Sequence, residues 1–136
     1  MAESRHARGL VDTSVLIDLD VIDPERLPRE LAISAITLAE LAAGPHATKD
    51  AAERARRQDR LQRTEATFEP LPVDGNVARA YGRVYAAVTA SGRKARGRRA
   101  TDLFIAATAL ATDLPLYTRN PADFAGLSEL LDVITV

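Results

Sequence analysis

The chain of 136 residues contains no cysteine, and aromatic residues make up only 4% of it. The absence of cysteine excludes disulfides, thiolate metal sites and cysteine nucleophiles. No apolar run reaches the roughly 18 residues that a membrane-spanning helix requires, and the polar opening MAESRHARG has no apolar stretch of the signal-peptide type. We therefore expect a soluble, cytoplasmic protein that does not associate with a membrane.

Apolar residues make up 46% of the chain, which is enough to build a core of Leu, Val, Ile and Ala. The length fits one compact domain, which we expect to cover residues 1–136 with a flexible N-terminus at 1–8. The net charge of −1 and the pI of about 6.1 neither favour nor exclude a nucleic-acid partner, because local patches matter more than the sum.

Short apolar runs alternate with helical patterns along the chain. Strands are expected at 9–11, 30–37, 68–73, 114–118 and 130–136. Helices are expected at 13–19, 37–44, 49–67, 74–90 and 100–112. Thr13 or Ser14 is placed to cap the first helix. Because strands that alternate with helices favour a parallel sheet, the pattern predicts an α/β sandwich with a mainly parallel sheet.

Four carboxylates lie among apolar neighbours, near the predicted ends of strands or starts of helices. They are Asp12, Glu40, Asp102 and Asp123. Sites in parallel sheets lie beyond the carboxyl ends of the strands, where repulsion among four acids would oppose folding. A divalent cation removes that repulsion, and carboxylate ligands suit Mg²⁺ or Mn²⁺ rather than zinc. The alternative is that each acid is an ordinary turn, surface or helix-capping residue.

The stretches LVDTSVLI, ITLAELAAG, ATDLFIAATAL and TRNPADF follow one another in this order over nearly the whole chain. They resemble the motifs of PIN-domain ribonucleases, specifically toxins of the VapC type. The resemblance implies a PIN-like three-layer α/β/α sandwich around a central, mainly parallel sheet of about five strands. It also implies that Asp12 and Asp102 are the principal magnesium ligands.

The same resemblance assigns the remaining site residues. Glu40 matches the acid of the second motif and Asp123 that of the last, so all four acids are candidate catalytic residues. Thr118 and Asn120 match the polar positions before Asp123, and Asn120 is an alternative to Asp123 as the fourth site residue. Ser14 is expected either to hydrogen-bond a carboxylate or a metal-bound water, or to cap the helix.

The implied activity is Mg²⁺-dependent endoribonuclease cleavage of RNA phosphodiesters by an activated water, in the toxin of a toxin–antitoxin pair. The implied partners are an RNA substrate, a VapB-type antitoxin in a hetero-oligomer, and a second copy of the chain. Two alternatives stay open: a non-catalytic RNA-binding or scaffold protein, and a phosphatase with Asp12 as nucleophile. A phosphatase of that kind usually needs a second acid two residues on, where this chain has Ser14.

Cations precede Asp102 in the basic loop 91–99, and we expect them to contact RNA phosphates without selecting bases. They are Arg93, Lys94, Arg96, Arg98 and Arg99. The alternative is a solvated basic loop. On the helix predicted at 49–67, interspersed acids favour a salt-bridged surface for a second basic set. That set comprises Arg54, Arg56, Arg57, Arg60 and Arg63.

Overall fold

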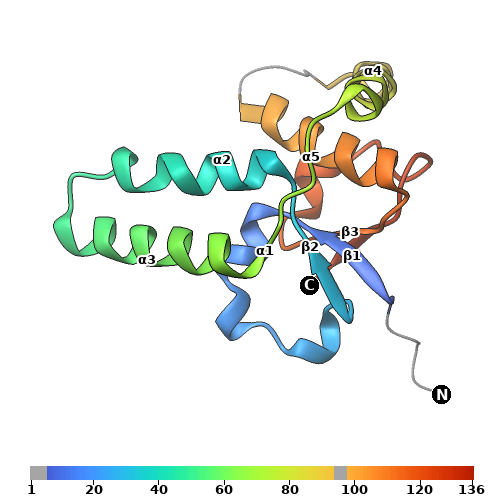
Figure 1. Ribbon diagram of the computed structural model, residues 1–136. Helices are drawn as coiled ribbons and strands as arrows, with labels where there is room; N and C mark the ends of the chain where they lie inside the picture. Colours follow the sequence, from blue (N-terminus) through green and yellow to red (C-terminus); the bar gives the residue numbers. More distant parts are fainter. Residues whose placement is uncertain (1–5, 94–97) are drawn as a thin grey trace.

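The computed structural model describes residues 6–93 and 98–136, and within them the chain forms one parallel sheet flanked by helices (Figure 1). The strands lie side by side in the order β2-β1-β3-β4. Their bounds are β1 (Arg8–Val11), β2 (Glu30–Ala32), β3 (Leu116–Thr118) and β4 (Val133–Thr135). The predicted α/β class with a mainly parallel sheet is confirmed.

Each helix predicted from the sequence is present, with shifted ends. The α-helices are α1 (Thr13–Ile17), α2 (Ala35–Ala43), α3 (Ala51–Thr67), α4 (Gly75–Ala90) and α5 (Arg98–Thr112). Short 3-10 helices lie at η1 (Leu19–Val21), η2 (Pro24–Arg26), η3 (Gly44–Ala47) and η4 (Pro121–Phe124). Because α5 already begins at Arg98, Arg98 and Arg99 belong to that helix and not to the predicted loop 91–99.

Helices cover both faces of the sheet, so the predicted three layers are present. Successive strand residues point to opposite faces, and each face has its own apolar core. Leu10 and Leu116 pack with buried side chains of α4 and α5. Val11 and Tyr117 pack on the other side with buried side chains of α1 and α2.

The helices α2 and α3 form a hairpin that extends away from the sheet (Figure 1). Along α3 only Thr64 is fully buried, in agreement with the thin apolar face that the sequence indicates. Much of α3 is therefore a surface helix, and one side of it faces α1 and η1 across a shallow hollow. Among the described residues, none of the helices combines the length and the apolar character that crossing a bilayer demands.

The sheet has four strands instead of about five, because the segment 68–73 forms only an isolated parallel bridge between Leu71 and Ser34. The Leu71 amide donates to the Ile33 carbonyl at 2.8 Å, and the Ala35 amide donates to the Leu71 carbonyl at 2.9 Å. Prolines at positions 70 and 72 have no N–H to donate, so the ladder stops after one residue.

The first strand begins within the segment 1–8 that was expected to be flexible. Arg8 pairs with Glu30 in the parallel ladder, and the Arg29 amide donates to the His6 carbonyl at 3.0 Å. Residues 6–8 are thus hydrogen-bonded to the segment that leads into β2, whereas residues 1–5 lie outside the described part.

Gly9 of β1 tests the packing of the sheet, because a Cβ built there would lie 2.6 Å from the Tyr117 ring and 3.1 Å from Pro28. Gly9→Ala is expected to lower the free energy of unfolding by about 1–3 kcal/mol, the usual cost of overpacking. Gly82 in α4 is the matched control, since nothing lies within 4 Å of its Cβ position. Gly82→Ala should raise the free energy by about 1 kcal/mol through helix propensity. Urea unfolding measures the free energy of unfolding of both variants. Equal changes of the same sign in the two variants would contradict the packing argument.

Candidate active site

Asp12 lies between β1 and α1 and is only 5% exposed. It is the N-cap of α1: its Oδ1 accepts hydrogen bonds from the Val15 amide at 3.1 Å and from the Ser14 hydroxyl at 2.6 Å. The prediction that Thr13 or Ser14 caps this helix is therefore wrong. The strand runs directly into the helix, so the cap position falls on the first residue after the strand, which is Asp12.

Thr118, at the end of β3, holds the other oxygen of Asp12. Its hydroxyl donates to Asp12 Oδ2 at 2.5 Å and accepts a hydrogen bond from the Asn120 amide at 2.9 Å. Thr118 is fully buried, and the Asp12 amide donates to the neighbouring Tyr117 carbonyl at 3.0 Å. The Asp12 carboxylate thus has two hydroxyl donors and one amide donor, which compensate for much of the cost of burying its charge.

Ser14 connects Asp12 to the segment after β3. Its Oγ donates to Asp12 and accepts a hydrogen bond from the Arg119 amide at 3.1 Å. Of the two expectations for Ser14, the structure shows the hydrogen bond to a carboxylate and gives the capping role to Asp12.

Glu40 of α2 reaches the same region through Thr13, whose hydroxyl donates to Glu40 Oε1 at 2.6 Å. The Thr13 hydroxyl also lies 3.2 Å from that of Thr37, which is fully buried. Thr13 and Thr37 were not predicted to be site residues. The available signals were that Thr13 directly follows Asp12, and that Thr37 stands three residues before Glu40 on the same helix face.

Asp102 lies in the second turn of α5, where it is electrostatically coupled to the other three acids. Burial raises the pKa of Asp102, and the carboxylates of Asp123, Glu40 and Asp12 raise it further, to about 6, while Arg99 opposes the rise. The four acids that the sequence placed at separate element ends therefore share one electrostatic neighbourhood.

The donor chemistry of this cluster fits a hard divalent cation, because carboxylate and hydroxyl oxygens are the side-chain atoms present. Burial first, and then the charges of Asp123, Glu40 and Asp12, raise the pKa of Asp102, and Arg99 offsets them only in part. In the part of the chain that the structure describes, however, no three Asp, Glu or His side chains converge closely enough to hold an ion. Asp12 and Glu40 are turned toward hydroxyl groups, so the carboxylates would have to reorient to bind one.

Asp123 and Asn120 lie at the start of the segment after β3. The Arg99 guanidinium donates to the Asp123 carbonyl at 3.3 Å and thereby ties the start of α5 to η4. Asn120 is exposed, and its amide hydrogen-bonds to Thr118. Among the charges that act on Asp102, that of the Asp123 carboxylate has the largest effect on its pKa, after burial.

The predicted RNA-binding cations are only partly visible. Arg93 is half-buried beyond the end of α4, and Arg99 is half-buried in the first turn of α5. Lys94, Arg96 and the side chain of Arg98 lie outside the described part of the structure.

Most of the second basic set forms the surface network that the sequence favours. Arg56 and Arg57 pair with Glu53 at 2.8 and 3.2 Å, and Arg63 pairs with Asp59 at 3.1 Å. Glu53 accordingly has a pKa below its usual value, because these two arginines hydrogen-bond to it.

Taken together, the parallel sheet and the acids beyond the carboxyl ends of its strands define an α/β protein with an acidic site at one sheet edge. Residues 9–129 match the PIN domain. The chain is 38% identical over 124 residues to Ribonuclease VapC5 of Mycobacterium tuberculosis, covering 89% of this chain and 88% of that protein. It is 36% identical to Ribonuclease VapC8 of the same species over 113 residues, which cover 80% and 96% of the two chains.

The fold also matches a crystal structure of a member of the VapBC family of toxin–antitoxin systems, VapBC-5 from M. tuberculosis. The TM-score is 0.83 at 38% identity, with 96% of this chain and 99% of that chain covered. The chain therefore belongs to the PIN-domain family and, within that family, to the VapC proteins.

Asp102→Asn tests the repulsion within the acid cluster. Burial and the neighbouring acids raise the pKa of Asp102 from the ordinary 3.8 to about 6 in the folded chain, so the folded state binds the proton more tightly. The free energy of unfolding therefore falls as the pH rises through this interval. Asp102→Asn should raise that free energy at pH 7–8 by about 1 kcal/mol after allowance for solvent screening, and the gain should vanish below pH 4.

Urea unfolding in EDTA from pH 3.5 to 8 measures this gain. Glu129→Gln is the matched control, because it removes one exposed carboxylate from the turn before β4. A gain of equal size at both ends of the pH range would show that repulsion is not its source.

Proposed function

We propose that this protein is a ribonuclease toxin of the VapC type that hydrolyses RNA phosphodiester bonds with the help of Mg²⁺. The observation that carries the proposal is that Asp102, besides being buried, is acted on by the carboxylates of Asp123, Glu40 and Asp12, which raise its pKa further. The names of the relatives, Ribonuclease VapC5 and Ribonuclease VapC8, support the same reaction class.

In this proposal Asp12 and Asp102 hold the ion, and Glu40 and Asp123 complete its surroundings. Bound Mg²⁺ would activate a water and stabilise the charge that develops on the phosphate during in-line attack. The chain's own residues supply orientation. Ser14 and Thr118 fix the two oxygens of Asp12, and Thr13 fixes Oε1 of Glu40. A carboxylate placed as Glu40 is can accept the proton of the attacking water.

Asp12→Asn and Asp102→Asn test the reaction. Each is expected to reduce RNA cleavage by at least about 100-fold, as removal of a key charge-stabilising group does in other enzymes, and to relieve any growth arrest on expression. Cleavage of structured RNA, followed on denaturing gels with Mg²⁺ or EDTA, measures the effect. Full activity of Asp12→Asn would show that Asp12 does not hold the catalytic ion.

The same assay separates the alternatives. Glu129→Gln should cleave like the parent protein. RNA binding without metal-dependent cleavage would support the non-catalytic alternative. Release of phosphate from a phosphomonoester by a protein that leaves RNA intact would support the phosphatase.

The basic segment before Asp102 is proposed to bind the phosphates that flank the scissile bond. Replacement of Arg93, Lys94 and Arg96 by Ala should weaken binding to all single-stranded RNAs and leave Mg²⁺ binding nearly unchanged. The log–log salt slope of the affinity should flatten by up to roughly 0.7 for each phosphate that the variant no longer neutralises. Binding of the Asp102→Asn protein across a KCl series measures the slope. A change confined to one RNA sequence would instead show that this segment reads bases or shape.

The proposed partner is a VapB-type antitoxin in a hetero-oligomer. The support is that the solved relative at 38% identity is titled as a member of the VapBC toxin–antitoxin family. A homodimer of this chain is proposed as the state in which it meets the antitoxin. An arginine of a partner can pair with carboxylates such as Asp12 and Asp102 where the ion would bind, which is a direct physical route to inhibition.

A further inference from the structure

A cleft of about 410 Å³ opens from the acid cluster toward α3. Thr13 and Glu40 line it on the side of the acids, and Glu53, Arg57 and Arg60 line it on the side of α3. This volume lies within the roughly 300–1,000 Å³ typical of small-ligand pockets. The cleft is thus large enough for a part of a substrate that extends beyond the acids.

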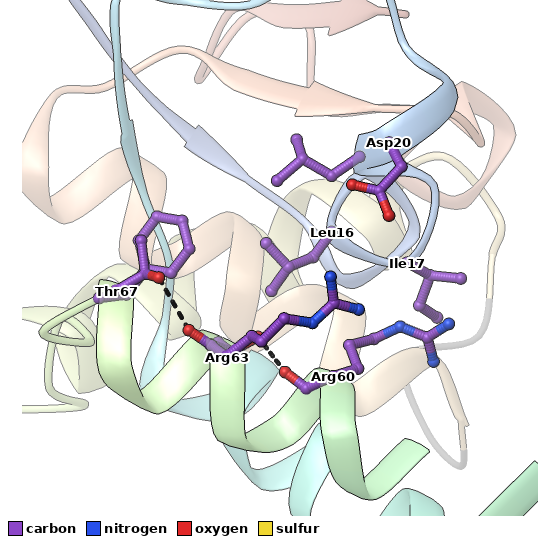
Figure 2. A pocket seen from close by; sticks show the side chains of 9 residues that line it. Leu16, Ile17, Asp20, Arg60, Arg63 and Thr67 are labelled. Carbon is purple, nitrogen blue, oxygen red and sulfur yellow. Dashed lines mark hydrogen bonds between the residues drawn. The ribbon is translucent and has the colours of Figure 1, made fainter. Parts of the chain in front are cut away.

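A second hollow of about 250 Å³ adjoins the cleft between α1, η1 and α3. Ile17 and Arg60 line both spaces, so they mark the junction. Figure 2 shows Arg60 and Arg63 reaching from α3 toward α1, with Ile17 beside Arg60. Leu16 and Phe68 give the second hollow an apolar lining. The two adjoining hollows form a groove beside Glu40 that is lined by arginines of α3, by apolar side chains and by Asp20 of η1.

Three arginines line these hollows, and among the described residues Arg57 and Arg63 have ion-pair partners while Arg60 has none; Asp20 of η1 also lines the second hollow. Arg57 pairs with Glu53 at 3.2 Å and donates to the Gly44 carbonyl at 2.9 Å, and Arg63 pairs with Asp59. Within the described ranges 6–93 and 98–136, Arg60 has no carboxylate within 4.0 Å.

The helical spacing explains this difference. Arg57 and Arg63 each have an acid four residues before them, whereas the positions three and four residues from Arg60 are Arg56, Arg57, Arg63 and Thr64. The half-buried Arg60 is thus left with its full charge at the junction of the two hollows.

We propose that Arg60 is a substrate-positioning residue that binds a phosphate of single-stranded RNA next to the scissile bond, with one nucleotide seated in the cleft beside Glu40. The inference rests on the proposed ribonuclease function. Glu40 and the neighbouring acids repel an RNA backbone, so an uncompensated guanidinium at the far side of the cleft is needed to hold the strand there. The apolar side chains of Ile17, Leu16 and Phe68 offer a surface for the adjoining base.

Arg60→Gln, Arg60→Lys and Arg56→Gln test the proposal. Arg56→Gln is the matched control, since it removes the same charge from the same helix but from a residue that lines neither hollow and already pairs with Glu53. Binding of a short, mixed-sequence single-stranded RNA is measured in the Asp102→Asn background across a KCl series, and cleavage kinetics are measured in the active protein.

Arg60→Gln is expected to weaken RNA binding roughly 3- to 10-fold, the worth of one partly exposed charge-assisted contact. It should flatten the salt slope by up to roughly 0.7 and raise KM more than it lowers kcat. Arg60→Lys should restore most of the slope, because it keeps the charge, and Arg56→Gln should bind like the parent. Thermal unfolding of the two Arg60 variants should match that of the parent, because Arg60 makes no ion pair within the described part of the folded chain.

The outcomes separate this inference from the function on which it rests. If the active protein cleaves no RNA, the proposed function fails. If it cleaves RNA and Arg60→Gln has the parent's affinity and salt slope, Arg60 does not bind the substrate. The inference is also overturned if Arg60→Gln keeps its affinity for RNA but loses affinity for an acidic protein partner. Equal losses in Arg60→Gln and Arg56→Gln would reduce the effect to overall charge and overturn the inference as well.

Discussion

The hydrogen bonds of the Asp12 carboxylate are the constraint on which the rest of the site depends. Through Val15 and Ser14 they fix the start of α1, and through Thr118 they fix the end of β3 against β1. An N-cap of this kind contributes about 1 kcal/mol to a helix, and a buried carboxylate without these donors would cost more than that. The carboxylate oxygens of Asp12 therefore connect β1, α1 and β3, and the same oxygens are proposed to bind the ion.

Repulsion among the four acids acts against the stability of the site. Burial raises the pKa of Asp102 most, and Asp123, Glu40 and Asp12 raise it further, so all four effects disfavour the charged form that the proposed function needs. The two apolar cores on either side of the sheet supply the stability that tolerates this repulsion. The arrangement is typical of a functional site, where local rules are broken and the surrounding packing compensates.

The sequence predicted what depends on local patterns and missed what depends on tertiary geometry. Apolar periodicity located α3, α4 and α5, and the four acids were placed at one sheet edge by the logic of parallel sheets. The prediction of a fifth strand was wrong because Pro70 and Pro72 have no N–H to donate on either side of Leu71, although the apolar pattern favours a strand. The role of Thr13 was missed because its partner, Glu40, lies 27 residues away and no local pattern joins the two.

The arginines of α3 differ in whether an acid stands one helical turn before them. A long surface helix with a thin apolar face gains from acid–base pairs at helical spacing, and Glu53 and Asp59 supply those pairs. These pairs neutralise Arg56, Arg57 and Arg63, each of which stands one helical turn after an acid. Arg60 has no acid one turn before it, so its charge is not neutralised in this way. The fold places that cation, Arg60, on a wall of the cleft that also holds Glu40. Spacing thus singles out Arg60, and the fold shows that it lines the same cleft as Glu40.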